Sequence, residues 1–326
     1  MSRPWRALIV GCGRIAGGYN RGPGDAMVLT HALAYHRHPG CILAGCVDPD
    51  EHVRIRFAAH WDVPKNYAKL DDALGSERFD IISVCTPTGT HLSTLRRVLQ
   101  ARPLAVLAEK PLDARAEEAR RVGRLFNEQS IPVAVNFTRR FDKSMHALRQ
   151  SIREGRYGAL DTVVGWYGKG VVNNASHLID LVRFLTDREP AVEGVSRALS
   201  YGVESDRTVT ASLNLGRLPF QLIGLSDSDG ARFELELTFA DAVVTVEDGG
   251  MTLRLRTWRR SEIFAGEREL DRGNWQPTAY GTAMLRALDE LRAWRPGSIL
   301  SSDIESAAAS IEVADALRIE ALETFA

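Results

Sequence analysis

Short apolar runs recur along the first part of the chain, and stretches with helical spacing separate them. The apolar runs occupy 7–11, 42–47, 80–85, 104–108 and 131–137. They do not alternate with polar residues, which is typical of strands that are covered on both faces. The stretches between them predict helices over 52–60, 90–100 and 114–128. This strand–helix–strand repetition predicts an α/β fold with a doubly wound parallel sheet.

The second part of the chain has a different pattern. Phe233, Leu235, Leu237 and Phe239 alternate with polar residues, and Leu253 and Leu255 alternate with arginines. Alternation predicts an antiparallel sheet with one apolar and one polar face. Two helices are predicted at about 277–294 and 303–323. We therefore divide the chain into two α/β domains, 1–138 and 139–326. The final helix can pack back on the first domain in this division.

Composition narrows the classes of partner. Among 326 residues, Lys+Arg number 41 and Asp+Glu number 42, so the net charge of −1 gives no electrostatic reason to expect nucleic acid or an anionic membrane. No apolar run is long enough to span a membrane, and the first one is too short for a signal peptide. The four cysteines lack metal-ligand spacing, so we predict no metal site, buried thiols and a cytoplasmic location. They are Cys12, Cys41, Cys46 and Cys85.

A glycine turn follows the first apolar run, in the segment Gly11-Cys12-Gly13-Arg14-Ile15-Ala16. Gly11 allows a tight bend from strand to helix, and Gly13 lets a pyrophosphate approach the backbone at the start of that helix. The turn predicts dinucleotide binding through Gly11, Gly13, Arg14 and Ile15. A tight turn that binds no ligand is the alternative.

Asp48 ends the second apolar run, where a carboxylate can accept hydrogen bonds from both hydroxyls of an adenine ribose. It would repel a 2′-phosphate, so NAD is predicted over NADP. The spacing from the glycine turn exceeds the usual ~20 residues. We interpret the excess, Gly17 to Thr30, as an insertion that is either a disordered surface loop or a flap beside a ligand.

Two loops after later strands carry polar candidates. Thr86, Pro87 and His91 follow the third apolar run, on the side of the sheet where ligands bind, and are predicted to contact the cofactor. His91 can alternatively cap or pack at the start of its helix. In Glu109-Lys110-Pro111, Lys110 is predicted to hold a substrate hydroxyl and to stabilise a developing alkoxide. A salt bridge to Glu109 or a neighbouring carboxylate is the alternative for this lysine.

A histidine in the second part is the other candidate for catalysis. His177 lies at the start of an amphipathic stretch, with Asn173 four residues before it and Asp180 three residues after it. Histidine titrates near neutral pH, so it suits a proton acceptor that is coupled to hydride transfer. A satisfied histidine at a domain interface is the alternative.

The order of these motifs resembles that of the Gfo/Idh/MocA oxidoreductases, over nearly the whole chain. The resemblance implies an NAD(P)-binding Rossmann domain and a second α/β domain with a large open, mainly antiparallel sheet that often serves oligomerisation. It implies that Lys110 and His177 flank the substrate carbon opposite the nicotinamide, that Glu109 and Lys110 contact the cofactor, and that four further residues bind substrate. These are Asn173, Asn174, Arg139 and Asp180.

One position departs from the family pattern: Asn173 stands where many members have an aspartate, and an amide cannot take a proton. The predicted function is an NAD-dependent oxidoreductase acting on a secondary alcohol of a sugar, sugar nucleotide or cyclitol. An NAD-dependent lyase or glycosidase that uses transient oxidation and a non-catalytic regulatory protein are the alternatives. A homodimer or homotetramer is expected, and the sequence does not identify the substrate.

Overall fold

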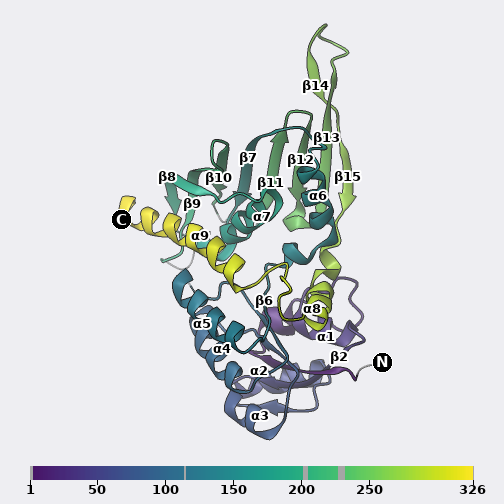
Figure 1. The fold of residues 1–326 in the computed structure, drawn as a ribbon, viewed down its shortest axis with the longest axis vertical. Coiled ribbons are helices and arrows are strands. Elements are labelled where there is room, and N and C mark those ends of the chain that lie inside the picture. Colours follow the sequence, from purple (N-terminus) through teal and green to yellow (C-terminus); the bar gives the residue numbers. More distant parts are fainter. Residues whose placement is uncertain (1–2, 114, 201–204, 227–231, 326) are drawn as a thin grey trace. The chain divides into compact units, whose positions relative to one another are not determined.

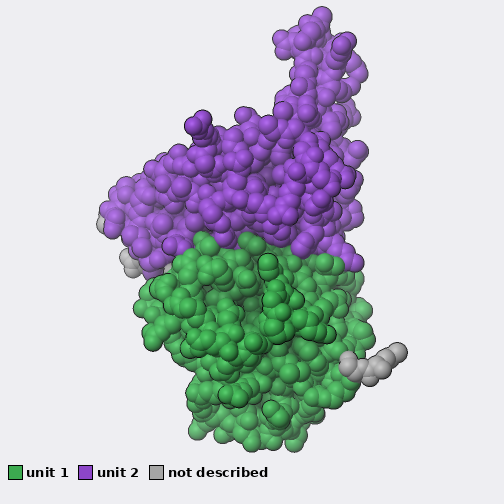
Figure 2. All heavy atoms as spheres, viewed as in Figure 1, with its two compact units in different colours: residues 1–141, 281–309 green, residues 142–280, 310–326 purple. Residues whose placement is uncertain are grey.

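The computed structural model describes residues 3–113, 115–200, 205–226 and 232–325. The chain forms two compact units, coloured separately in Figure 2: residues 1–141 with 281–309, and residues 142–280 with 310–326. The first boundary falls three residues after the predicted one. The segment 281–309, which the sequence division places in the second domain, belongs to the first unit. The predicted α/β fold class is confirmed.

The first unit is built on a six-stranded parallel sheet in the order β3-β2-β1-β4-β5-β6. The order reverses between β1 and β4, which is the arrangement of a doubly wound sheet. Strands β4, β5 and β6 are fully buried and β1 and β2 are largely so, as their apolar runs require, whereas the short edge strand β3 is polar and partly exposed. Their bounds are β1 Trp5–Val10, β2 Cys41–Val47, β3 Asn66–Tyr67, β4 Ile81–Val84, β5 Ala105–Ala108 and β6 Val133–Val135.

Helices cover this sheet, and four of the predicted ones are present, including α8 Ala283–Ala293 within the predicted 277–294. The other three are α2 Glu51–His60, α4 His91–Gln100 and α5 Ala116–Glu128, accompanied by α1 His31–Arg37 and α3 Leu70–Ser76. Helix α8 joins the first unit because its buried residues belong to the same apolar cluster as α1 and β2. Neither α1 nor α3 is predicted, since each spans only seven residues and shows little periodicity.

The insertion from Gly17 to Thr30 is an organised loop, so the first of its two interpretations, a disordered loop, is wrong, and the second, a flap beside a ligand, stays a prediction. Asn20 is 6% exposed and lies at its centre. The amide of Asn20 donates to Asp25 and to the Met27 carbonyl, while Oδ1 accepts from Leu29 N and from Thr30 Oγ1. The glycine turn leads only into a five-residue helical segment, Arg14–Gly18, and the loop then carries the chain to α1.

The second unit is built on a mainly antiparallel sheet in the order β14-β13-β12-β11-β7-β10-β9-β8, with β15 paired to β13. Among the described strands of this sheet, only β7 and β10 pair in parallel. Burial alternates along β11, as predicted from its sequence. Strands β13 and β14 extend beyond the sheet as a long hairpin (Figure 1). The bounds are β7 Leu160–Tyr167, β8 Ala191–Leu199, β9 Thr208–Asn214, β10 Pro219–Gly224, β11 Glu234–Phe239, β12 Ala242–Glu247, β13 Thr252–Arg260, β14 Arg268–Leu270 and β15 Asn274–Pro277.

Helices α6 Lys143–Arg153 and α7 Ser176–Thr186 pack on the apolar face of this sheet and share its core. Asp142 is buried and starts α6, because its Oδ1 accepts from Ser144 N at 2.7 Å. The final helix, α9 Ile304–Thr324, begins in the first unit and contributes Ala314, Leu317 and Ala321 to the core of the second. No helix among the described residues is long and apolar enough to cross a membrane.

Candidate active site

The glycine turn has the geometry that its sequence predicts. Gly11 has φ of +91°, and a Cβ there would lie 2.7 Å from the Cys85 carbonyl carbon and oxygen and 2.8 Å from Thr86 N. Only glycine therefore lets β1 approach the loop after β4 this closely. Gly13 is exposed, and a Cβ built on it meets nothing within 4 Å. The open space at Gly13 fits a ligand that lies against the backbone of the turn.

Asp48 is tied to the glycine turn by its carboxylate. Its Oδ2 accepts from Cys12 N at 2.8 Å, and its Oδ1 accepts from Asp50 N at 2.9 Å. Each carboxylate oxygen can accept a further hydrogen bond. The side chain is half-buried, so these acceptor sites remain accessible to a ligand. The turn and the carboxylate together fit the pyrophosphate and adenine ribose of a dinucleotide.

A pocket of about 540 Å³ opens beside the same turn, between the insertion loop and α2. Val53, Phe57 and Trp61 supply apolar surface, and four side chains carry or can carry positive charge, namely Arg14, Arg21, Arg56 and His60. No acidic side chain is among its lining residues in the described part of the chain. Such a lining suits an anionic group.

The loop after β4 contains a buried hydroxyl and a buried histidine. Thr86 Oγ1 has no hydrogen-bond partner among the described residues, which is costly for a buried polar atom and leaves it available to a bound group. His91 is 1% exposed, with Nδ1 2.8 Å from the Pro111 carbonyl and Nε2 2.5 Å from the Thr86 carbonyl. His91 thus joins the loop after β4 to the loop after β5, while Pro87 is exposed. Cofactor contacts of Pro87 and His91 stay predictions.

Lys110 follows β5 at the carboxyl end of the sheet, and it precedes a cis peptide bond to Pro111. It is half-buried, whereas its neighbour Glu109 is 7% exposed. Burial alone would raise the pKa of Glu109, but hydrogen bonds from His31 and Asn136 and the positive charge of Lys110 hold it below its ordinary value. Glu109 is therefore a buried carboxylate beside the candidate catalytic lysine.

In the second unit, the segment before α7 is held by a carboxylate that the sequence analysis missed. Asp206 accepts from Val172 N at 2.8 Å and from Asn173 N at 2.9 Å. Gly170, with φ of +85°, leaves room for it, because a Cβ there would lie 2.3 Å from Asp206 Oδ2. The amides of Asn173 and Asn174 donate to the carbonyls of residues 169 and 168; Asn173 is exposed and Asn174 is half-buried.

His177 is the second residue of α7 and is half-exposed. Its ring lies edge-on to Phe233, with the ring centroids 6.3 Å apart. Asp180, by contrast, is 2% exposed, and its Oδ1 accepts from Ser310 Oγ of α9 at 2.8 Å. Asp180 therefore has a packing role within the second unit. Its predicted contact with substrate stays a prediction.

Arg139 lies in a short helical segment, Thr138–Phe141, of the first unit and is 8% exposed. Other residues near Glu109 escaped the sequence analysis altogether: His31 and Tyr35 of α1, and Ser83 of β4. Ser83 occupies one position of an apolar strand, and a polar residue inside such a run was the signal that a buried polar partner was required.

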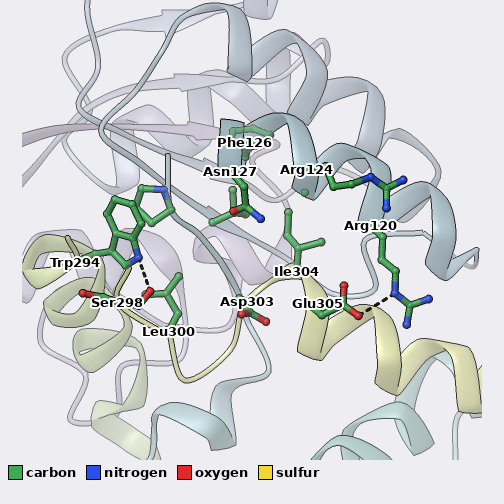
Figure 3. Close-up of a pocket in the computed structure, with 13 residues that line it drawn as sticks. Arg120, Arg124, Phe126, Asn127, Trp294, Ser298, Leu300, Asp303, Ile304 and Glu305 are labelled. Carbon is green, nitrogen blue, oxygen red and sulfur yellow. Dashed lines mark hydrogen bonds and ion pairs between the residues drawn. The ribbon is translucent and has the colours of Figure 1, made fainter. Parts of the chain in front are cut away.

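A second hollow, of about 150 Å³, lies between α5 and the segment that precedes α9 (Figure 3). Arg120 and Glu305 form an ion pair there at 3.0 Å, and Trp294 Nε1 donates to the Ser298 carbonyl. None of the predicted site residues lines this hollow. Among the described residues, no group of three or more histidines, cysteines and acidic residues is placed to hold a metal ion, and all four cysteines are buried free thiols, as predicted.

The glycine turn, Asp48 and the loop that carries Lys110 all fall within 5–137, the range that matches a family model described as an oxidoreductase family with an NAD-binding Rossmann fold. This is the Gfo/Idh/MocA family, so the resemblance seen in the sequence is confirmed. Residues 5–137 match the NAD-binding Rossmann domain of this family, which is less than half of the chain.

Relatives with known names share part of the chain. It is 26% identical over 200 residues to the rhizopine catabolism protein MocA of Rhizobium meliloti, covering 57% of this chain and 58% of that protein. It is 31% identical over 135 residues to an inositol 2-dehydrogenase of R. meliloti strain 1021, covering 37% and 41%. The matches thus span about half the length of these curated relatives.

Solved structures share the fold over nearly the whole length. A putative myo-inositol dehydrogenase from Sinorhizobium meliloti 1021 matches with a TM-score of 0.75 and 20% identity, covering 98% of each chain. The WlbA dehydrogenase from Bordetella pertussis, in complex with NADH and UDP-GlcNAcA, matches with a TM-score of 0.73 and 18% identity, covering 99% of this chain and 98% of that one. At these identities the likeness shows the fold.

Proposed function

We propose that this protein is an NAD-dependent oxidoreductase that moves a hydride between a nicotinamide and a secondary alcohol of a sugar, sugar nucleotide or cyclitol. The observation that carries the proposal is Lys110 beside the buried carboxylate Glu109, at the same edge of the parallel sheet as the glycine turn. Ligands of doubly wound sheets bind at the carboxyl ends of the strands. The proposed dinucleotide site and Lys110, whose positive charge can stabilise an alkoxide, thus lie at the same edge of the sheet.

The chain's own residues have distinct roles in this proposal. The nicotinamide group, when bound, accepts or gives the hydride. Gly11, Gly13 and Asp48 hold the dinucleotide, and Lys110 donates a hydrogen bond to the reacting oxygen and stabilises negative charge on it. His177 takes the hydroxyl proton during oxidation, because a neutral imidazole is a suitable base near neutral pH.

NAD is proposed as the cofactor because the Asp48 carboxylate would lie against a 2′-phosphate and repel it. NADP is the second candidate, and the pocket beside the glycine turn favours it. Arg14, Arg21 and Arg56 line that pocket, and arginine is well suited to phosphate. The relatives do not decide between the two, since solved structures of this fold include one in complex with NAD+ and a putative NADPH-dependent oxidoreductase.

The substrate class is inferred from polar side chains and from relatives. Asn173 and Asn174 carry amides that can bind hydroxyl groups, and the exposure of Asn173 keeps it accessible within its unit. Several named relatives are inositol dehydrogenases, and one structural neighbour was solved with a sugar nucleotide. Arg139 and Asp180 remain in the proposed substrate set, although both are buried.

We also propose that the protein is a cytoplasmic homodimer or homotetramer. The outer face of the second sheet supports an interface: Thr238 is half-buried, and Arg254 is held by the Arg272 carbonyl and by the ring of Trp275, 4.2 Å away. Light scattering at micromolar concentration should give a mass of at least twice 36.0 kDa. A species of only 36.0 kDa would remove this part of the proposal.

The proposed function is tested by incubating the protein with NAD and a panel of polyols, aldoses and nucleotide sugars while NADH absorbance is followed. Net NADH formation with at least one member is expected. A substrate that is consumed without net NADH, but only when NAD is present, would point to transient oxidation and hence to a lyase or glycosidase. Binding of NAD with no reaction across the panel would count against the dehydrogenase.

A further inference from the structure

A chain of buried polar side chains in the first unit leads from helix α1 to Glu109. Tyr35 Oη lies 2.7 Å from Ser83 Oγ, and Ser83 Oγ lies 2.7 Å from His31 Nδ1. On the other side of the imidazole, His31 Nε2 lies 2.8 Å from Glu109 Oε1. Tyr35, Ser83 and His31 are each at most 1% exposed. Each of these buried polar groups has a hydrogen-bond partner, which offsets the cost of removing it from water.

When the His31 imidazole is neutral, the hydrogens along this row of side chains have one order. An ionised carboxylate only accepts hydrogen bonds, so His31 Nε2 must donate to Glu109. In a neutral imidazole, Nδ1 then accepts from the Ser83 hydroxyl, which in turn accepts from the Tyr35 hydroxyl. Every hydroxyl hydrogen in the chain then has an acceptor, and every donor is directed toward Glu109.

The far end of the chain is closed. Tyr35 is 1% exposed and belongs to the apolar cluster of the first unit, so the chain has no outlet to solvent there. The row of hydrogen bonds therefore does not conduct protons between Lys110 and bulk water. It can hold the Glu109 carboxylate in one orientation, since buried and fully paired networks rigidify the groups they contain.

Glu109 receives two donors on a single oxygen. Asn136 Nδ2 also donates to Oε1, at 2.6 Å, while Oε2 accepts no hydrogen bond from the described residues. The titratable groups that face Glu109 are His31, Lys110 and Cys85. The pKa of the Cys85 thiol is raised well above its ordinary value by burial and by the charge of Glu109, so Cys85 is neutral. Glu109 is thus a negative charge whose pKa the positive charge of Lys110 helps to lower.

We propose that His31 is a positioning residue, which keeps Glu109 an oriented carboxylate so that Lys110 stays a charged hydrogen-bond donor for the substrate oxygen. His31 acts through Glu109 and has no predicted contact with substrate. The activity part of this inference rests on the proposed function. The charge state of Glu109 does not, and it can be measured in protein without any ligand.

Infrared spectroscopy tests the charge state directly. A protonated carboxyl group has a carbonyl band that disappears when the group ionises. The part of this band that wild type has and Glu109→Gln lacks belongs to Glu109, and its intensity is followed as the pH is changed to find the midpoint of ionisation. His31→Phe keeps a ring of similar size and removes both ring nitrogens. Loss of the His31 hydrogen bond should move the midpoint of this band upward by roughly 1–2 pH units, the value of one hydrogen bond to a charged group. His36→Phe, an exposed position on the same helix, is the matched control and should leave the midpoint unchanged.

The expected kinetic effect is a roughly 10–100-fold loss of kcat in His31→Phe, typical of a misplaced catalytic group, with little change in NAD affinity. The acidic limb of the kcat profile should move to higher pH, because a larger fraction of Glu109 is protonated at a given pH. His31→Gln, which can still donate to Oε1, should recover most of the loss. Tyr35→Phe removes the hydroxyl at the far end of the hydrogen-bonded row. It should move the midpoint of Glu109 in the same direction by a smaller amount, and it replaces His31→Phe in the test if that variant does not fold.

The possible outcomes separate the two ideas. An unchanged Glu109 midpoint in folded His31→Phe or, where that variant does not fold, in folded Tyr35→Phe would overturn the inference, even if stability fell. A shifted midpoint in a protein that forms no NADH with any substrate would support the role of His31 in charge control and count against the proposed function. A shifted midpoint together with a lower kcat supports both.

Discussion

The surroundings of Lys110 and those of His177 are built in different ways. Beside Lys110, Glu109 is a buried carboxylate with donors from two other elements. Before His177, the segment is held mainly through backbone groups, with Asp206 accepting from the amides of Val172 and Asn173. The first arrangement fixes a charge, and the second fixes the path of the chain.

This contrast follows the chemistry proposed for each residue. A group that stabilises negative charge must stay charged and in place, and low-dielectric surroundings strengthen its effect. A proton acceptor must change its charge in every cycle, and a half-exposed histidine does so at low cost. Substitutions in the two regions should therefore differ in size and in their pH dependence.

The largest effect is expected from removing the fixed charge. Lys110→Met should lower kcat by about 10²–10⁴-fold while NAD affinity changes little, because the lysine acts mainly on the reacting oxygen. Lys69→Met replaces an exposed lysine of the same unit and is the control. Single-turnover kinetics and NAD titration measure the two quantities. A loss below about tenfold would assign Lys110 a structural role.

The two glycines of the turn separate folding from binding. Gly11→Ala should destabilise the protein by roughly 2–5 kcal/mol, from backbone strain at positive φ and the close contact with Cys85. Gly13→Ala meets open space and has φ of −78°, so it should fold normally but bind NAD more weakly. Thermal unfolding and NAD titration of both variants check this. Equal losses of stability would contradict the predicted open space at Gly13.

Replacing the proton acceptor should change the pH profile more than the cofactor site. Only a neutral imidazole accepts a proton, so the rate of oxidation should rise with pH and then level off. His177→Asn should flatten this limb and lower kcat by about 10²-fold. His52→Asn, at an exposed position of the first unit, is the control. If the limb remains in His177→Asn, another group is the acceptor.

The smallest effect concerns cofactor choice. NAD should bind more tightly than NADP. Asp48→Ala should reduce that preference by about tenfold, because it removes a hydrogen bond to the ribose of NAD or the repulsion of the 2′-phosphate of NADP. Arg56→Ala, in the pocket beside the turn, should weaken NADP and leave NAD unchanged if NADP uses that pocket. Tighter binding of NADP than NAD by the wild type would refute the prediction.

Much of the first unit could be predicted because most of its strands are continuous apolar runs, and Gly11 and Asp48 directly follow two of them. The short helix α1 could not, since it follows an irregular loop and its buried face includes His31. The sequence also could not predict that 281–309 belongs to the first unit, because α8 has an apolar stripe that does not show which core it joins.

The site itself was predicted unevenly for the same reason. Residues at strand ends, such as Asp48 and Lys110, have positions that topology fixes. Ser83 and Asp206 are partners that depend on contacts between distant segments, and one sequence does not reveal those. Asp180 has helical spacing from His177, but the side of α7 that meets α9 is decided by packing, which buries Asp180 against Ser310.

The central claim is that hydride leaves a substrate carbon for a bound nicotinamide with Lys110 holding the oxygen. The most direct measurement uses a substrate from the panel that is deuterated at the oxidised carbon, with NADH analysed by proton NMR. We expect deuterium at C4 of the nicotinamide, a slower rate than with the unlabelled substrate, and the same labelling at a far lower rate in Lys110→Met. Unlabelled NADH, with the deuterium released to water, would contradict the account.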